Sequence, residues 1–193
     1  MKLKRWEIAL LASLIAVLVF CALPIRAQNR LSEKLVRLHV VANSDTEEDQ
    51  RLKLLVRDAV LSAADGADAE DETLPARLQA AAEQTLRENG CQDAVTVKRT
   101  RMWFDTREYA TFSLPAGYYD ALRVTIGAGE GHNWWCVLFP PLCAGVCEED
   151  LTEIAAQAGL TDDEIAFLCD EETPYVIRFK VVELWGKLLN WIS

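Results

Sequence analysis

A strand that runs directly into an amphipathic helix is the feature that most limits the folds open to this chain. Residues Leu35–Val41 alternate as a buried strand does, and Asn43–Asp45 end the strand. Ser44 with Glu47 three residues later predicts a capping box that starts the helix. The helix's apolar positions recur at helical spacing: Leu52, Leu55, Val56, Ala59 and Val60. A fold that combines strands and helices follows.

The rest of the chain repeats both kinds of pattern. A second helix is predicted at Leu74–Glu88, followed by strands at Ala94–Arg101, Tyr109–Leu114 and Ala121–Ile126, with a turn at Pro115–Gly117. Helices are then predicted at Glu148–Gln157, at Asp162–Leu168 and from about Val181. This order predicts one α+β domain at residues 34–193. Its sheet is expected to be mostly antiparallel, with about four strands, and covered on one face by helices.

The amino terminus has the pattern of an export segment. Met1–Arg5 is basic, and Ile8–Phe20 is apolar except for Ser13. We therefore predict that residues 1–28 are a signal peptide or a membrane anchor. Ile25–Ala27 is a poor cleavage site, so both alternatives stay open. In either case the remainder of the chain is expected outside the cytoplasm, with the membrane as a partner through this segment.

The charge balance argues against nucleic-acid binding. The chain has 30 acidic and 20 basic residues, a formal net charge of −10. Several of the basic residues lie in the first 30 positions, so the body is more acidic still. Affinity for nucleic acids depends on clustered Lys and Arg that release counterions from phosphates. We therefore expect no nucleic-acid partner.

The sequence predicts no cofactor, metal or small-molecule substrate. Gly127–Gly131 follows a strand, but no helix with Lys and Ser or Thr comes after it, so a flexible turn that lets the backbone approach closely is favoured over a phosphate loop. Zinc ligands are available but loosely spaced: His132, Cys136, Cys143 and Cys147. A disulfide between Cys136 and Cys143, or buried thiols, is favoured instead.

One enzymatic alternative stays open. Cys136 or Cys143 with His132 or His39 as the base would suit an extracytoplasmic hydrolase that acts on peptide or cell wall. Apolar neighbours argue against Cys136, because they raise the pKa of a thiol and make it inert. No pair of carboxylates is arranged for acid–base catalysis, so we expect no enzyme.

The segment Asn133–Cys143 is the best candidate for a binding surface. It is almost entirely apolar and matches neither an alternating strand nor a helix. Tryptophan is a frequent anchor of protein interfaces, and adjacent prolines present a rigid apolar ridge. The predicted partner-binding residues are Asn133, Trp134, Trp135, Phe139, Pro140 and Pro141, with Asn43 and Asp45 as a polar addition. One tryptophan is expected to face the core and the other the solvent.

Two blocks of sequence resemble the stage II sporulation protein R family: LHVVANSDTEEDQRLKLLVRDAV from Leu38 to Val60 and PAGYYDALRVTIGAGEGHNWWCVLFPPLC from Pro115 to Cys143. The resemblance implies a secreted signalling protein made in the forespore and exported into the space between forespore and mother cell. It also implies a partner, the membrane-embedded aspartic protease stage II sporulation protein GA. The activated protease would process the precursor of sigma factor E in the mother cell. The resemblance supplies no catalytic residues.

The capping box yields a stability prediction. Ser44→Ala removes one half of the predicted box and should lower the free energy of unfolding by about 1 kcal/mol. Urea denaturation of the variant beside the parent measures the difference. An unchanged free energy would mean that the helix begins elsewhere.

Overall fold

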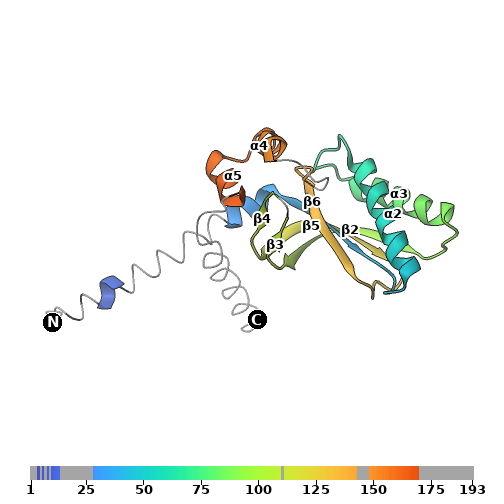
Figure 1. Cartoon of the computed structure of the whole chain (residues 1–193), viewed down its shortest axis with the longest axis horizontal. Coiled ribbons are helices and arrows are strands. Elements are labelled where there is room, and N and C mark those ends of the chain that lie inside the picture. Colours follow the sequence, from blue (N-terminus) through green and yellow to red (C-terminus); the bar gives the residue numbers. More distant parts are fainter. Residues whose placement is uncertain are drawn as a thin grey trace.

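A computed structural model describes residues 4, 6, 8, 10–13, 28–109, 111–142 and 148–169 of the chain. A helical segment at 28–34 precedes the first strand. The elements that follow are β1 Val36–Val41, α2 Glu47–Ala64, α3 Leu74–Glu88, β2 Val95–Phe104, β3 Arg107–Glu108, β4 Ser113–Leu114, β5 Gly117–Ile126, β6 Asn133–Phe139, α4 Glu148–Gln157 and α5 Asp162–Cys169 (Figure 1).

The main sheet has the strand order β2-β5-β1-β6 and is mixed, so the prediction of a mostly antiparallel sheet was wrong. Strand β1 runs parallel to β5, while β1 with β6 and β2 with β5 are antiparallel. The parallel pair arises because the two helices α2 and α3 carry the chain from β1 to the edge strand β2, and β5 then returns beside β1. Helical connections of this length are what parallel pairing requires.

Each face of the sheet has its own apolar core. Helices α2 and α3 cover one face, where they pack on inward side chains such as Leu38, Val124 and Leu138 (Figure 1). The other face is covered at one end by the 28–34 segment, the hairpin β3–β4 and α5, around Leu31, Leu114 and Leu168. An ion pair of 2.7 Å between Lys34 Nζ and Glu164 Oε2 joins the 28–34 segment to α5. The sequence predicted helices on one face of the sheet only. The layer on the second face was not predicted.

Two strand predictions need correction. Tyr109–Leu114 is not one strand, because Tyr109 and Phe112 stack at 4.5 Å in the turn between β3 and β4. The segment from Asn133, predicted to be irregular, forms strand β6 as far as Phe139. Its alternation is hidden because both sides of an edge strand contact apolar groups here: Trp134 packs on one core and Trp135 on the other.

The start of α2 lies two residues later than predicted. Thr46 is the N-cap, and its Oγ1 accepts a hydrogen bond of 3.3 Å from the backbone N–H of Asp49. Ser44 instead donates from Oγ to the Asp49 carboxylate at 2.5 Å and accepts from the Thr46 backbone N–H at 3.2 Å. The predicted pairing of Ser44 with Glu47 was therefore wrong, although the helix itself was predicted correctly.

The predicted export segment falls mostly outside the described residues, as do Cys143, Cys147 and the helix predicted from Val181. Within the part of the chain that the structure describes, no helix has the length and apolar character needed to cross a membrane.

The observed cap changes the expected effects of substitution. Thr46→Ala removes the oxygen that satisfies the Asp49 N–H and should lower the free energy of unfolding by about 1 kcal/mol. Urea denaturation tests this, with the exposed Leu54→Ala on the same helix as a control for loss of side-chain area. If Thr46→Ala has no effect and Ser44→Ala does, Ser44 is the residue that holds the start of the helix.

Candidate functional site

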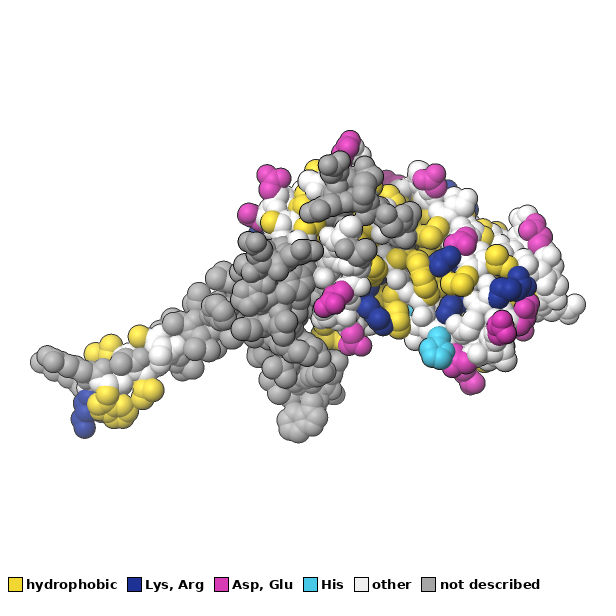
Figure 2. Space-filling view, viewed as in Figure 1, with side chains coloured by type: hydrophobic (Ala, Val, Ile, Leu, Met, Phe, Trp, Pro, Cys, Tyr) yellow, Lys and Arg dark blue, Asp and Glu magenta, His cyan; other side chains and the backbone are white. Residues whose placement is uncertain are grey.

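Strand β6 lies at one border of the sheet and carries the two adjacent tryptophans. We call β6, together with the side chains that contact Trp134 and Trp135, the tryptophan edge. Both indoles are half-buried. Figure 2 shows hydrophobic side chains beside basic ones along the line that β6 follows in Figure 1. A half-buried aromatic edge of this kind offers rigid apolar area to a partner.

Trp134 lies on the face covered by α2 and α3. The guanidinium carbon of Arg57, on α2, is 5.0 Å from the centre of the Trp134 ring, a cation–π distance. Arg57 is also paired with Asp58 at 2.7 Å. The indole thus joins the strand to the helix.

Trp135 lies on the opposite face, between two other side chains. The His39 ring stacks on the indole with centroids 5.7 Å apart and an angle of 15° between the planes. The guanidinium carbon of Arg107, from β3, is 4.1 Å from the ring centre. Arg107 is exposed and forms no ion pair within the described residues. This face of the edge therefore presents an aromatic ring with a free positive charge.

The tryptophans do point to opposite faces, as adjacent residues of a strand must. The expectation that one is core and the other exposed was wrong, because each indole is half-buried against a different layer. At the start of β6 neither face is fully covered, whereas Cys136, Val137 and Leu138 farther along the strand are buried.

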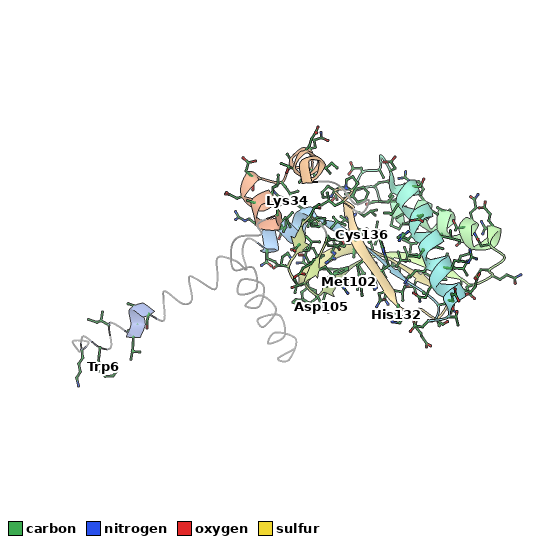
Figure 3. All side chains as sticks on the ribbon, viewed as in Figure 1. Trp6, Lys34, Met102, Asp105, His132 and Cys136 are labelled. Carbon is green, nitrogen blue, oxygen red and sulfur yellow. The ribbon has the colours of Figure 1, made fainter. Side chains whose placement is uncertain are left out.

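A polar contact between two turns fixes the start of β6. The side-chain oxygen of Asn43 accepts a hydrogen bond of 2.9 Å from Ala128 N–H, and Asp45 accepts one of 2.6 Å from His132 N–H. The His132 ring also contacts Asp45 through Nδ1. Figure 3 places His132 beside the start of β6. The turn at Asn43–Asp45 lies in the first of the two sequence blocks that resemble the family, and the turn at Gly127–His132 lies in the second.

The glycines of the second turn make this approach possible. A Cβ built on Gly131 would lie 2.2 Å from the backbone oxygen of Ser44, and one on Gly127 would lie 2.2 Å from Asn43 Oδ1. Gly127 also has a φ of +54°, which other residues rarely adopt. The predicted close approach of the backbone at this turn is confirmed, and its neighbour is the turn that precedes α2.

Asn43 and Asp45 thus stabilise the fold through hydrogen bonds. Asn43 also donates to the Asp49 carboxylate at 3.0 Å, and hydrogen bonding from Ser44 holds the pKa of Asp49 below its usual range, with Asn43 contributing. Lys53, itself almost fully buried, donates to the His132 carbonyl at 3.1 Å. The predicted role of Asn43 and Asp45 in recognition of a partner stays a prediction.

The remaining predicted residues lie farther along β6. Phe139 and Pro141 line a pocket of about 400 Å³ with the end of α2, while Pro140 is buried beside them. Asn133, at the start of the strand, bonds His39 Nε2 through its side-chain oxygen at 2.9 Å. The sequence thus singled out the segment that forms β6 as a surface candidate, but it predicted neither the strand nor the pocket at its end.

The cysteine–histidine arrangement does not form with Cys136. This residue is in a disulfide, so its sulfur is no free thiol, and its predicted partner Cys143 lies outside the described residues. Cys136 faces the α2 side of the sheet, whereas His39 faces the other side. Within the described residues no group of three or more His, Cys, Asp or Glu side chains could hold a metal ion.

Sequence reasoning missed a buried arginine beside His39. Arg37 has no exposed surface, and its guanidinium carbon lies 4.1 Å from the ring centre of Phe104 and 5.1 Å from that of Tyr119. Among the described residues its one side-chain hydrogen bond is donated to Tyr109 Oη, at 3.0 Å. Burial lowers the pKa of Arg37, and the nearby tyrosines oppose that shift. The signal was present: a charged residue alternating with apolar ones in a buried strand.

The residues that form the main sheet and the tryptophan edge lie within a match to a known family. The family model described as stage II sporulation protein R matches residues 32–149, more than half of the chain. The chain belongs to the stage II sporulation protein R family.

A curated relative agrees with this assignment. The stage II sporulation protein R of Bacillus subtilis (strain 168) is 35% identical over 123 residues, which cover 58% of this chain and 55% of the relative. The chain thus aligns with about half the length of that relative. No solved structure matches the chain significantly.

The half-burial of the indoles predicts similar effects for the two substitutions. Trp134→Ala and Trp135→Ala should each lower the free energy of unfolding by about 1 to 3 kcal/mol, less than the ~3–5 kcal/mol of a fully buried tryptophan. Both proteins should stay folded. Urea denaturation measures the cost, and complete unfolding of one variant alone would show that its indole belongs to the core.

The buried His39 predicts a pH effect on stability. Burial lowers the pKa of His39 below its ordinary value of 6.5, although the Asn133 hydrogen bond opposes this. Below that ordinary value the unfolded chain binds more protons than the folded one, so stability should fall with falling pH. Urea denaturation at about pH 7.5 and about pH 6 should show a smaller difference in His39→Gln than in the parent. Equal differences would contradict this assignment.

Proposed function

We propose that this protein is an exported sporulation signal that activates the membrane-embedded aspartic protease stage II sporulation protein GA. The activated protease then processes the precursor of sigma factor E in the mother cell. The observation that carries the proposal is membership of the stage II sporulation protein R family, which supports a role in sporulation. The basic and apolar amino terminus supports export from the forespore into the space between the two cells.

The tryptophan edge supports action by binding. A ligand shifts its receptor between two states only by binding one more tightly than the other. A rigid surface with two anchored indoles and a free guanidinium suits such selective contact, because little side-chain entropy is lost on binding. Cys136 is in a disulfide and lies on the opposite face of the sheet from His39. Both facts weaken the alternative of a hydrolase that uses Cys136 with His39.

Co-expression tests the proposal. The full chain is produced with the candidate protease and the sigma factor E precursor, and processing is followed by the change in precursor size. Processing should rise well above the level without the chain. If it does not rise, the proposed function is wrong.

Two substitutions separate signalling from hydrolysis in the same assay. Trp135→Ala should reduce processing severely, as loss of an interface anchor does. His132→Gln should have a mild effect, because the His132 ring is exposed and, among the described residues, Asp45 is its one hydrogen-bond partner. Loss of processing in His132→Gln with normal folding and secretion would favour the hydrolase.

A further inference from the structure

The face of the sheet opposite α2 and α3 carries a row of basic and aromatic side chains. The layer formed by the 28–34 segment, the hairpin β3–β4 and α5 packs on residues such as Tyr119 and Ala121. The next row of paired residues crosses all four strands: Lys98, Arg123, His39 and Trp135. Its lysine and its arginine are exposed, and its tryptophan is half-buried. The row therefore lies where the described part of the covering layer ends.

The exposed cations of this row have no counter-charge beside them. No residue of β1, β2, β5 or β6 with its side chain on this face is an Asp or Glu. Arg107 of β3 is exposed too, with its guanidinium carbon 4.1 Å from the ring centre of Trp135. We call the row together with Arg107 the cation row. Among the described residues, Lys98, Arg107 and Arg123 form no ion pair.

The arginines of the two long helices differ in this respect. Each arginine of α2 and α3 has a carboxylate partner: Arg51 with Glu48, Arg57 with Asp58, Arg77 with Asp71 and Arg87 with Glu83. The chain contains 30 acidic side chains and has a net charge of −10. Carboxylates are thus abundant, yet the part of the chain that the structure describes supplies none to the cation row. Its charge is available to a carboxylate from another molecule.

Two buried side chains beside the row add to its positive character. Arg37 has no exposed surface and His39 only 5%, and both lie on this face of β1. Arg37 Nε and Nη1 and His39 Nδ1 have no hydrogen-bond partner. Burial lowers the pKa of both side chains, and the charge of Arg107 lowers that of Arg37 further, as Arg123 does for His39. A carboxylate bound beside Arg107 and Arg123 offsets this repulsion.

We propose that the cation row binds carboxylate side chains from an acidic segment of a partner protein. The carboxylates form ion pairs with Arg107 and Arg123, since a guanidinium presents paired N–H donors that match the two oxygens of a carboxylate. The segment also covers the exposed part of the Trp135 ring, which supplies apolar area beside the charges. The proposal deepens the proposed function, on which it rests in taking the segment to belong to the activated protease.

An anionic membrane surface fits the cation row less well than a protein segment does. Basic segments that bind anionic lipids carry about four to eight Lys or Arg. The cation row has three exposed cations: Lys98, Arg107 and Arg123. The net charge of −10 repels an extended anionic surface, whereas a short acidic segment approaches only the row. Charge complementarity therefore favours the carboxylates of a protein.

Binding is tested on the full chain with a defined probe. The probe is a blocked, fluorescently labelled decapeptide of alternating Glu and Ala, and the control peptide has Gln in place of Glu. Fluorescence anisotropy measures both affinities. The Glu peptide should bind at least about tenfold more tightly, and this preference should shrink with added salt. Equal binding of the two peptides, or no binding of the Glu peptide, would overturn the proposal.

Matched variants locate the binding surface. Arg107→Gln and Arg123→Gln each remove one charge from the cation row and should weaken binding of the Glu peptide by about fivefold or more. Arg101→Gln is the control, because Arg101 is exposed on β2 with its side chain on the opposite face of the sheet. It should bind as the parent does, and urea denaturation shows that each variant is folded. An equal loss in Arg101→Gln would mean that overall charge, not the cation row, binds the peptide.

Vesicles distinguish a protein site from a membrane site. The parent and the three variants are mixed with phosphatidylcholine vesicles and with vesicles that also contain phosphatidylglycerol. Arg107→Gln and Arg123→Gln should bind both kinds of vesicle as the parent does. If they lose binding to phosphatidylglycerol but bind the Glu peptide as the parent does, the cation row is a membrane site and the proposal is wrong.

The processing assay separates this proposal from the proposed function. If the parent raises processing and Arg107→Gln and Arg123→Gln are as active as Arg101→Gln, the carboxylate site is wrong and the signalling function stands. If the parent does not raise processing, the signalling function fails, and the peptide measurements decide the carboxylate site independently.

Discussion

The contact between the turn before α2 and the turn before β6 determines how the rest of the structure is arranged. Asn43 and Asp45 hold the backbone of the second turn at Ala128 and His132. Because β1 leads into the first turn and β6 leaves the second, this contact sets β6 against β1. The position of both indoles, and of the pocket at the end of β6, depends on that pairing. A few hydrogen bonds at one end of the sheet thus place a surface that extends to the other end.

Local signals predicted the elements whose structure is determined locally. The sequence placed β1, α2 and α3 correctly because their apolar periods are clear and both helices end at polar or glycine residues. It did not predict the parallel pairing of β1 with β5, since pairing partners leave no trace in a single strand. Strand β6 was missed for a different reason: apolar layers on both sides removed the alternation that normally indicates a strand.

In the candidate site too, local features could be predicted and contacts between distant elements could not. Trp134, Trp135 and Phe139 could be identified as surface candidates from composition alone. The side chains that give the tryptophans their setting could not, because Arg57, Arg107 and His39 come from three other elements. Arg37 is a further case. Its guanidinium is buried among aromatic rings without a carboxylate partner in the described residues, so attraction by the rings and one tyrosine offsets part of its desolvation.

The guanidinium of Arg107 also bears on how copies of this protein behave toward one another. A strand at the border of a sheet with apolar flanks is a common starting point for sheet-to-sheet aggregation. If two copies joined through β6, each would bring its own Arg107, Arg123 and Lys98 toward the same side of a continuous sheet, and the like charges would repel. These cations therefore oppose the joining of two copies through β6.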